Sequence, residues 1–572
     1  MPLETLPMEI TNFVSSSHVA PRPPREIAKT FVIIFIFTYL FLFLGMTLRP
    51  TLYDEAIMLT GSMQVGAGLL PHRDFYTLYG PAGFYILTAL FKVLGQSILV
   101  ERLLDLLFRA LIVASVYTIA SSYLRRSIAL WTAAGTLFWL YGLFSLIVGT
   151  ALVPASFFNL ISTALLIPLF STTVTKRRMA AAGALAAIAV LFRYDLGIFL
   201  LGVHTCIVAT AIWLRFKTNK VSAFFSAFWP YLAAFIVIIL PPALYYLSVS
   251  SLDPLLFDVV RFPGQYYHRS RNLPFPGITR ESLDNVSIYL PIPVIALSLY
   301  RFAMTFRSPA NGDETISNRE TRQLGGFFFS FAILALAMCS KDMVRTSVAN
   351  SYLAAIPCLL LVAALFQQRR SFPGYLRVSI VVLALLSIMA PAWTSHRELE
   401  KLHNKHASIP ESVWTSVRGT TPASRTAWCK IPNAATRGLC FLPTDNEIQT
   451  IEFIDTHTRP DQKLFVGVSR HDKIYTNDML IYFASQRLPA TAWAEFDTDL
   501  QSQDEIQKQM IRDLEHNRPP FIVLDSEFEN VSEPNDSARS SGVTLLDDYI
   551  GKNYKHVRTF GALSILQNTS AP

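Results

Sequence analysis

The chain has 572 residues, of which 52% are hydrophobic and only 16% are charged. Soluble proteins carry about a quarter charged residues, so this composition and a mean hydropathy of +0.36 exclude an ordinary soluble domain and indicate a polytopic membrane protein. The net charge is +8, but the basic residues lie mostly in short segments between apolar runs, with no basic aromatic platform for nucleic acid, and are therefore a topology signal.

The N-terminal segment, residues 1–29, is polar and is expected to be a cytoplasmic tail. No small-residue cleavage site follows the first apolar run at 30–48, so we expect this run to be retained as a membrane span. Arg22, Arg25 and Lys29 precede it, and basic residues favour the cytoplasmic side. The segment 49–98 is then expected to be an external loop.

The following apolar runs are mostly long enough to cross the hydrocarbon core, for which about 17 residues suffice. The run at 84–94 is too short and is expected to lie at the interface. The remaining spans are predicted at 99–123, 127–147, 149–170, 179–193, 196–214, 222–249, 286–305, 325–339, 350–366 and 375–393. Four basic clusters between them then face the cytoplasm, which predicts a membrane domain at 30–395 with about 11 transmembrane helices and an external C-terminus.

The composition changes after residue 396, where apolar runs shorten and charge rises. Buried strands are predicted at 464–468 and 521–524, helices at 448–455 and 505–516, and one or two strands at 554–566. This alternation predicts a C-terminal soluble α/β domain at 396–572. It contains no Gly-rich phosphate loop and no metal-ligand cluster. The external loops contain no clear Asp-x-Asp pair, so we expect no cofactor and no metal.

The chain has five cysteines. Cys206, Cys339 and Cys358 lie in or at the ends of predicted spans and are expected to pack as small apolar residues. Cys429 and Cys440 lie in the C-terminal domain, where an extracytoplasmic compartment would permit a disulfide between them.

The most informative segment follows the first span and reads RPTLYDEAIMLTGSMQVGAGLLPHRDFYTLYGP over residues 49–81. It places adjacent acids, Asp54 and Glu55, near the bilayer surface and a further acid at Asp74. Ionisable groups at a membrane edge are costly and suggest a functional site, although solvated charges flanking a helix are the alternative.

This segment resembles the GT-C superfamily of membrane glycosyltransferases, which take a sugar from a polyprenyl-phosphate carrier. Relatives include the protein O-mannosyltransferases and the lipid A aminoarabinose transferase. The resemblance rests on three features: Tyr53-Asp54-Glu55-Ala56, the spaced Gly68, Pro71 and Asp74, and the Tyr79-Gly80-Pro81 turn leading into Phe84-Tyr85. It covers about residues 30–395 and implies a catalytic membrane domain that serves glycan biosynthesis in the cell envelope. The acceptor, a lipid, glycan or protein, stays open.

Transfer from such a donor is a displacement at the anomeric carbon, in which the acceptor hydroxyl loses a proton to a nearby base. The resemblance implies Asp54 as this base. Adjacent helix residues do not share a face, so only one acid of the pair is expected to face substrate. Glu55 orients Asp54, binds acceptor or is structural. Asp74 is a candidate for sugar or acceptor binding, with an ion pair to Arg73 as the alternative.

The departing phosphate needs cations or hydrogen-bond donors. Arg193 is a candidate because relatives often carry a basic residue near this point. The alternative is a turn between two spans in which Arg193 and Asp195 neutralise each other. Lys341 and Arg345 lie in another short segment predicted to be external. Relatives show Arg-x-Asp-x-x-His there, which this chain matches only in part, and anchoring to lipid headgroups is the alternative.

The segment 258–271, DVVRFPGQYYHRSR, combines basic and aromatic side chains and is predicted to be part of an external loop at 250–284. Aromatic rings stack on sugars and bases meet phosphate, which makes Tyr266, Tyr267, His268 and Arg269 candidates for substrate binding. An interfacial aromatic belt is the alternative.

Other functions are weighed against this one. A transporter or flippase of a lipid-linked saccharide should show internal repeats and charges near the midplane, which the sequence does not display. A ligase or polymerase using a diphosphate-linked donor usually has its largest external loop late among the spans, whereas here the informative loop is the first. The sequence therefore favours a glycosyltransferase, expected to be inverting, in the cell (inner) membrane.

Overall fold

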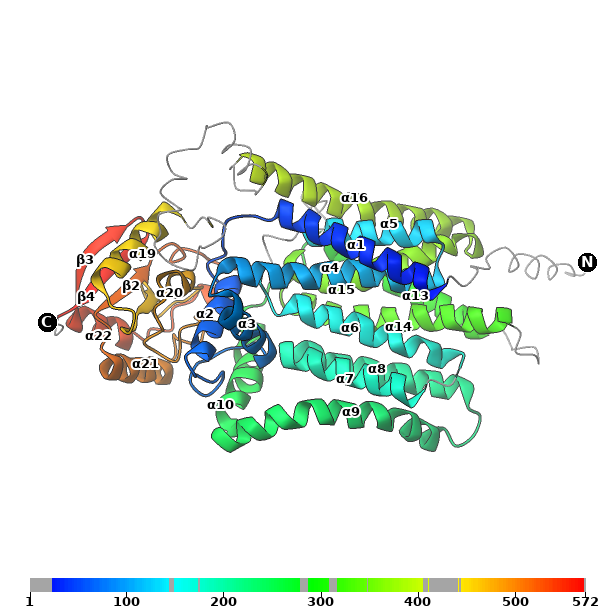
Figure 1. Ribbon diagram of the computed structural model, residues 1–572, viewed down its shortest axis with the longest axis horizontal. Coiled ribbons are helices and arrows are strands. Elements are labelled where there is room, and N and C mark those ends of the chain that lie inside the picture. The colour runs from blue at the N-terminus through cyan, green and yellow to red at the C-terminus, as the bar shows by residue number, and fades with distance from the viewer. Residues whose placement is uncertain are drawn as a thin grey trace, which may run out of the picture.

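The computed structural model describes residues 23–142, 149–172, 175–277, 286–307, 316–346, 348–404, 410, 441 and 444–569. A bundle of long helices carries an α/β domain at one end, and the short helices α2 (Asp54–Gly66), α3 (Pro81–Leu94) and α10 (Leu252–Leu256) lie between the two (Figure 1). The junction between bundle and domain is therefore built by the segments that follow α1 and α9.

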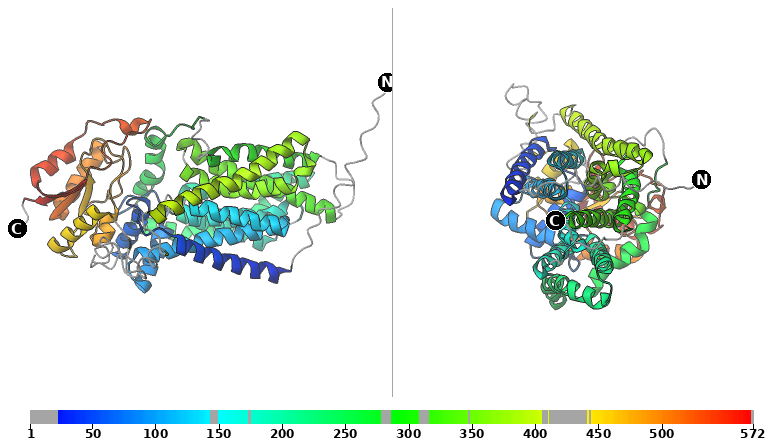
Figure 2. Two further views of the ribbon diagram at one scale, coloured as in Figure 1. Left: turned by 90° about the horizontal axis from the view of Figure 1, so that it is seen from above. Right: turned by 90° about the vertical axis from the view of Figure 1, so that its right-hand side faces the viewer.

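The bundle contains α1 (Pro24–Gly45), α4 (Ile98–Tyr123), α5 (Arg126–Gly142), α6 (Leu152–Leu166) with η3 (Ile167–Phe170), α7 (Lys176–Phe192), α8 (Tyr194–Arg215), α9 (Lys220–Val249), α13 (Pro291–Arg307), α14 (Ile316–Val344), α15 (Val348–Gln367) and α16 (Gly374–Asn404). Each predicted span falls on one of these helices. Among the described residues, 7 helices are long and apolar enough to cross a membrane. The others run beside them (Figures 1 and 2), which confirms a polytopic helical protein.

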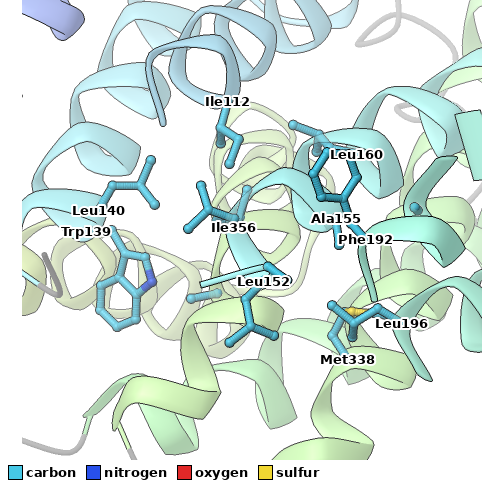
Figure 3. Packing of buried hydrophobic residues seen from close by; sticks show 14 of the residues in the cluster. Ile112, Trp139, Leu140, Leu152, Ala155, Leu160, Phe192, Leu196, Met338 and Ile356 are labelled. Atoms are coloured by element: carbon cyan, nitrogen blue, oxygen red, sulfur yellow. The ribbon is translucent and has the colours of Figure 1, made fainter. Parts of the chain in front are cut away.

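The interior of the bundle is packed by large apolar side chains from helices distant in sequence. Figure 3 shows Ile112, Trp139, Leu152, Leu196 and Ile356 converging from α4, α5, α6, α8 and α15, and all are buried. In contrast, α1, α9 and α16 expose most of their apolar surface. Such exposure is expected of helices that face lipid rather than other helices.

The C-terminal domain contains a four-stranded sheet of order β1-β2-β4-β3. Its elements are α19 (Asp445–His457), β1 (Phe465–Val468), α20 (Leu480–Ser485), α21 (Asp504–Asn517), β2 (Phe521–Asp525), η9 (Asp536–Ala538), α22 (Leu545–Asn553), β3 (Tyr554–Phe560) and β4 (Leu563–Asn568). β1 and β2 are parallel, and β4 is antiparallel to both β2 and β3. The predicted strands and helices of this domain are confirmed.

Two predicted loops are wrong, because the chain there is helical. Residues 252–270 form α10, two π-helical turns at Phe257–Arg261 and Pro263–Tyr267, and α11 (His268–Ser270). The backbone N–H of Phe262 bonds to Phe257 O in the wide π register, which brings the chain to Pro263, a residue that has no N–H to satisfy. Likewise α14 continues through Lys341 to Val344, since no Pro or Gly interrupts it there.

The cysteines differ from one another in their surroundings. Cys358 is buried in α15 and Cys339 is half-buried in α14, as small apolar residues are. Cys206 is exposed on the outer surface of α8, so its predicted packing is wrong: its position faces away from the neighbouring helices. The proposed Cys429–Cys440 pair lies outside the described residues.

Candidate functional site

Asp54 is the first residue of α2, at the end of the bundle that carries the α/β domain. The turn before it is fixed reciprocally: Thr51 N–H donates to Glu55 Oε2 over 2.8 Å, and Glu55 N–H donates to Thr51 Oγ1 over 3.2 Å. An acid in the first turn also interacts favourably with the helix dipole. The Asp54 side chain is half-buried, and its Oδ1 accepts a hydrogen bond from Tyr79 Oη over 3.1 Å.

Glu55 points in a different direction from Asp54 and is fully buried. Its carboxylate receives two hydrogen bonds from Arg102 of α4, through Nε to Oε1 and through Nη2 to Oε2, the latter over 2.8 Å. Arg102 also donates to the backbone oxygens of Thr47 and Arg49, over 3.1 and 3.0 Å. The pair therefore holds the start of α2 against α4, and the two acids diverge as helix geometry requires.

Tyr79 is positioned by the glycine that follows it. Gly80 N–H donates to Phe192 O over 3.0 Å, and the Gly80 Cα packs directly against the end of α7. An added Cβ would lie 2.7 Å from the carbonyl carbon of Leu191, so only glycine permits this approach. Pro81 then starts α3, where its missing N–H costs nothing.

Arg193 lies at the break between α7 and α8, next to Tyr79. Its guanidinium carbon is 5.3 Å from the Tyr79 ring centroid, and its Nε bonds to Asp195 Oδ1 over 3.1 Å. Within the described chain, its two terminal nitrogens make no hydrogen bond, and its side chain is 19% exposed. The alternative interpretation is confirmed, because Asp195 pairs with Arg193. Arg193 also lies near Asp54, and its contact with a phosphate stays a prediction.

The α/β domain contributes acids to the same place. Asp497 accepts hydrogen bonds from Arg271 Nε over 2.9 Å, from a second Arg271 nitrogen, and from Tyr267 Oη over 2.8 Å. Tyr53, the residue before Asp54, donates from its hydroxyl to Phe496 O over 2.7 Å. These contacts join α2, the segment after α9 and the domain. We call Asp54, Tyr79, Arg193, Tyr267, Arg271, Glu495 and Asp497 the junction cluster.

Burial sets the protonation of the acids in the junction cluster. Burial raises the pKa of Asp54, while the Tyr79 hydrogen bond and the charges of Arg193 and Arg271 act in the opposite direction. Burial, and then the Asp497 charge, raise the pKa of Glu495 well above its usual value. Glu495 is 4% exposed, and its Oε2 has no hydrogen-bond partner within the described ranges.

A buried histidine, His72, connects segments that lie next to the junction cluster. His72 bonds through Nδ1 to Asp258 Oδ2 over 2.9 Å and through Nε2 to Tyr194 Oη over 3.1 Å. Thr77 N–H also donates to Asp258, over 3.4 Å. This chain of contacts ties the first loop to the start of α8 and to the π-helical segment. These hydrogen bonds therefore fix the backbone next to Arg193.

The other predicted site residues are placed less centrally. Asp74 pairs with Arg73, with Nη2 and Oδ2 2.6 Å apart, and accepts Leu70 N–H; burial opposes ionisation, but these bonds lower the pKa of Asp74. Arg345 pairs with Glu533, again over 2.6 Å, and so joins the end of α14 to the domain. Arg269 is exposed.

Of the two predicted tyrosines, only one contacts the junction cluster. Tyr267 belongs to the junction cluster through Asp497, whereas Tyr266 stacks on Phe262 with ring centroids 5.5 Å apart. His268 and Lys341 lie in helices, and their side chains are outside what the structure describes. No group of three or more His, Cys, Asp or Glu that could hold a metal ion occurs in the described ranges.

Sequence reasoning did not single out Arg271, Glu495 or Asp497 as site residues. The alternation Trp493-Ala494-Glu495-Phe496-Asp497, acids between aromatic residues, is a signal, but a weak one in a domain without motifs. Tyr79 was identified only as part of a turn. Nothing in the sequence indicated the pairing of Glu55 with Arg102.

Comparison with known proteins gives a fold rather than a close relative. No protein-family profile matches the chain, and no curated protein sequence matches it. The crystal structure of ArnT from Cupriavidus metallidurans bound to undecaprenyl phosphate superimposes with a TM-score of 0.52 at 12% identity, covering 96% of this chain and 99% of that one. The shared fold agrees with the predicted architecture, a helical membrane domain followed by a C-terminal α/β domain.

Two further structures show weaker likeness. The Archaeoglobus fulgidus oligosaccharyltransferase tethered with an acceptor peptide gives a TM-score of 0.49 at 11% identity, over 94% of this chain and 74% of that one. The mycobacterial arabinofuranosyltransferase AftD gives 0.44 at 14% identity, over 96% and 42%.

Proposed function

We propose that the chain is a glycosyltransferase that moves a sugar from a polyprenyl-phosphate donor to a hydroxyl group of an acceptor. The proposal rests on the position of the Asp54 carboxylate. Its half-buried carboxylate stands beside Arg193 at one end of the bundle, and its Oδ2 has no hydrogen bond to the described residues. ArnT, which shares the fold, was crystallised with undecaprenyl phosphate.

In this mechanism Asp54 is the general base. The acceptor oxygen attacks the anomeric carbon, the bond from that carbon to the phosphate oxygen breaks, and the acceptor proton passes to Asp54 Oδ2. A single displacement of this kind inverts the anomeric configuration. The polyprenyl phosphate departs with the bonding electrons and carries the negative charge that a cation must stabilise.

Arg193 is the cation best placed for this role, because its terminal nitrogens are uncommitted among the described residues. Arg271 is held by Asp497, so it supplies positive potential rather than a free donor. We assign Glu55 a structural role through Arg102. We expect transfer to need no metal, and loss of activity in a chelator would contradict this.

The proposal includes an orientation of the chain in the membrane. We place the N-terminus in the cytoplasm, and the junction cluster and the α/β domain on the extracytoplasmic face of the cell membrane. Arg25 at the start of α1 and Lys220 at the start of α9 lie at the end of the bundle opposite the domain, as basic residues on the cytoplasmic side would (Figure 1). Labelling of single cysteines in the domain by a membrane-impermeant reagent tests this assignment.

The central experiment uses the full chain in native-lipid vesicles with a panel of polyprenyl-phosphate sugars. Donor consumption is measured for the wild type, for Asp54→Asn, and for Asp461→Asn, an exposed acid far along the chain. Loss of a general base costs about 10²- to 10⁴-fold in rate. We therefore expect Asp54→Asn to consume donor at least a hundredfold more slowly, and Asp461→Asn to match the wild type.

The alternatives give different results. Equal rates for the wild type and Asp54→Asn would reject Asp54 as the base, and Asp74→Asn would be tested next. No consumption of any donor with native acceptor lipids present would reject the enzyme and favour a transporter. Movement of lipid-linked saccharide across the vesicle bilayer would then be measured.

A further inference from the structure

A cavity lies next to the junction cluster, with Tyr76 in its wall. It has a volume of about 550 Å³ and is walled by three parts of the chain: the first loop, the helical segment after α9, and the α/β domain. Its residues include His72, Arg73, Tyr76, Phe257, Trp493 and Arg512. We call it the junction cleft.

The aromatic wall of the junction cleft is rigid. Trp493 stacks on Tyr76 with centroids 5.7 Å apart and planes 29° from parallel, and it meets the edge of Phe257 at 6.1 Å. Trp493 is only partly buried, and its indole N–H makes no hydrogen bond within the described residues. An aromatic ring held in this way offers a flat surface and a donor at low entropic cost.

One face of α21 supplies the opposite, polar wall. Gln509 and Arg512 are three residues apart, so they lie on the same side of the helix, and both line the cleft. Neither side chain makes a hydrogen bond or ion pair among the described residues. Lys508, in contrast, lies outside the cleft and pairs with Asp504 over 2.5 Å.

The charges in the junction cleft largely cancel. Arg261 pairs with Asp253 over 2.7 Å, Arg73 pairs with Asp74, and His72 bonds to Asp258. The remaining Arg512 and Asp513 have opposite signs. A cleft without net charge is poorly suited to a lipid phosphate or a nucleic acid, whereas flat rings and free hydrogen-bonding groups suit a neutral, hydroxyl-rich ligand.

The cleft and the junction cluster share one residue. The Tyr76 ring lines the cleft, and its hydroxyl lies 3.4 Å from Asp497 Oδ2. We propose that the junction cleft binds the saccharide chain of an uncharged glycan acceptor, whose end then reaches Asp54. This inference rests on the proposed function and narrows its acceptor to a glycan.

Binding is tested separately from catalysis. The full-length protein and its Asp54→Asn variant are titrated calorimetrically with neutral gluco-, manno- and galacto-oligosaccharides. We expect one class to bind both proteins equally. Trp493→Ala and Arg512→Ala should weaken that binding about tenfold, since an aromatic contact or a hydrogen bond to a charged group contributes about that factor. Lys508→Ala, on the same helix, should bind as the wild type does.

Trp493→Phe guards against a folding artefact, because it keeps the ring and should retain most of the affinity. Binding of no neutral oligosaccharide, equal binding by Arg512→Ala, or tighter binding of anionic lipid vesicles would each overturn the inference. If donor is consumed but no saccharide binds, the proposed function stands and this inference fails. If saccharide binds but no donor is consumed, saccharide binding by the junction cleft is supported and the proposed function fails.

Discussion

The Tyr79 hydroxyl donates a hydrogen bond to Asp54 Oδ1 over 3.1 Å, which ties the carboxylate at the start of α2 to the turn that precedes α3. A hydrogen bond to the ionised form stabilises it. This contact therefore opposes the rise in the pKa of Asp54 that burial causes. Under the proposed function, we therefore expect Tyr79 to be a positioning residue that sets the pH range in which Asp54 can act as a base.

Tyr79→Phe removes the hydroxyl and keeps the ring. The pKa of Asp54 then rises further, so the base is deprotonated only at higher pH. We expect the rising acidic limb of the kcat/KM profile to shift to higher pH, with little change at the alkaline plateau. Tyr289→Phe, whose hydroxyl bonds to the backbone of Pro276, serves as control. An unshifted limb would show that Tyr79 does not tune the base.

Arg102 should matter more for stability than its partner Glu55. Arg102 lies within ion-pair distance of two buried acids, Glu55 and Glu101, and Asp105 pairs with Arg109 over 2.6 Å. Arg102→Met leaves the three acids with Arg109 alone and should cost about 3–5 kcal/mol. Glu55→Gln removes one acid, keeps both arginines and should cost less. Thermal unfolding in detergent measures both, and the reverse order would contradict this account.

Glu533 should make the fold acid-sensitive. Burial opposes its ionisation, but hydrogen bonds from Arg345, Asn535 and Tyr475 outweigh burial and lower the pKa of Glu533 to about 2. The unfolded value is higher, so the stabilisation is present at neutral pH and is lost as the pH falls from about 4.5 towards 2.

The gap in Tm between the wild type and Glu533→Gln should therefore be largest at neutral pH and shrink on acidification. Glu515→Gln, an exposed acid on α21, should show no such gap. A gap that widens in acid would mean that Arg345 does not stabilise the Glu533 carboxylate.

Gly80→Ala should displace Tyr79. The new Cβ would stand 2.9 Å from the carbonyl carbon of Phe192 and closer still to Leu191. We expect a loss of about 1–3 kcal/mol in stability, as for other overpacked sites, together with reduced transfer. Gly202→Ala on α8 meets nothing within 4 Å and is the matched control. Equal behaviour of the two variants would show that the turn tolerates a side chain.

The sequence predicted the parts of the fold that local pattern determines. Long apolar runs marked the membrane helices, and short apolar runs marked β1 and β2. It failed at 252–270, part of a predicted external loop, where the chain stays helical by widening to π turns.

Only the part of the candidate site around Asp54 could be predicted from the sequence. Asp54 follows a span and carries a recognisable motif, so local reasoning reached it. Its partners come from elsewhere: the Tyr53–Phe496 hydrogen bond joins residues 443 apart in sequence. No periodicity or composition encodes such a contact, and the diverging roles of Asp54 and Glu55 follow from packing against Tyr79 and Arg102.

Because Glu495 and Asp497 come from the C-terminal domain, the order of synthesis has a consequence. A nascent chain that has already inserted α1 to α16 still lacks Asp497, the acid that holds Arg271 and Tyr267 in place. The junction cluster is completed only when the last part of the chain has been made and folded. A truncated or stalled product would occupy the membrane without an assembled site.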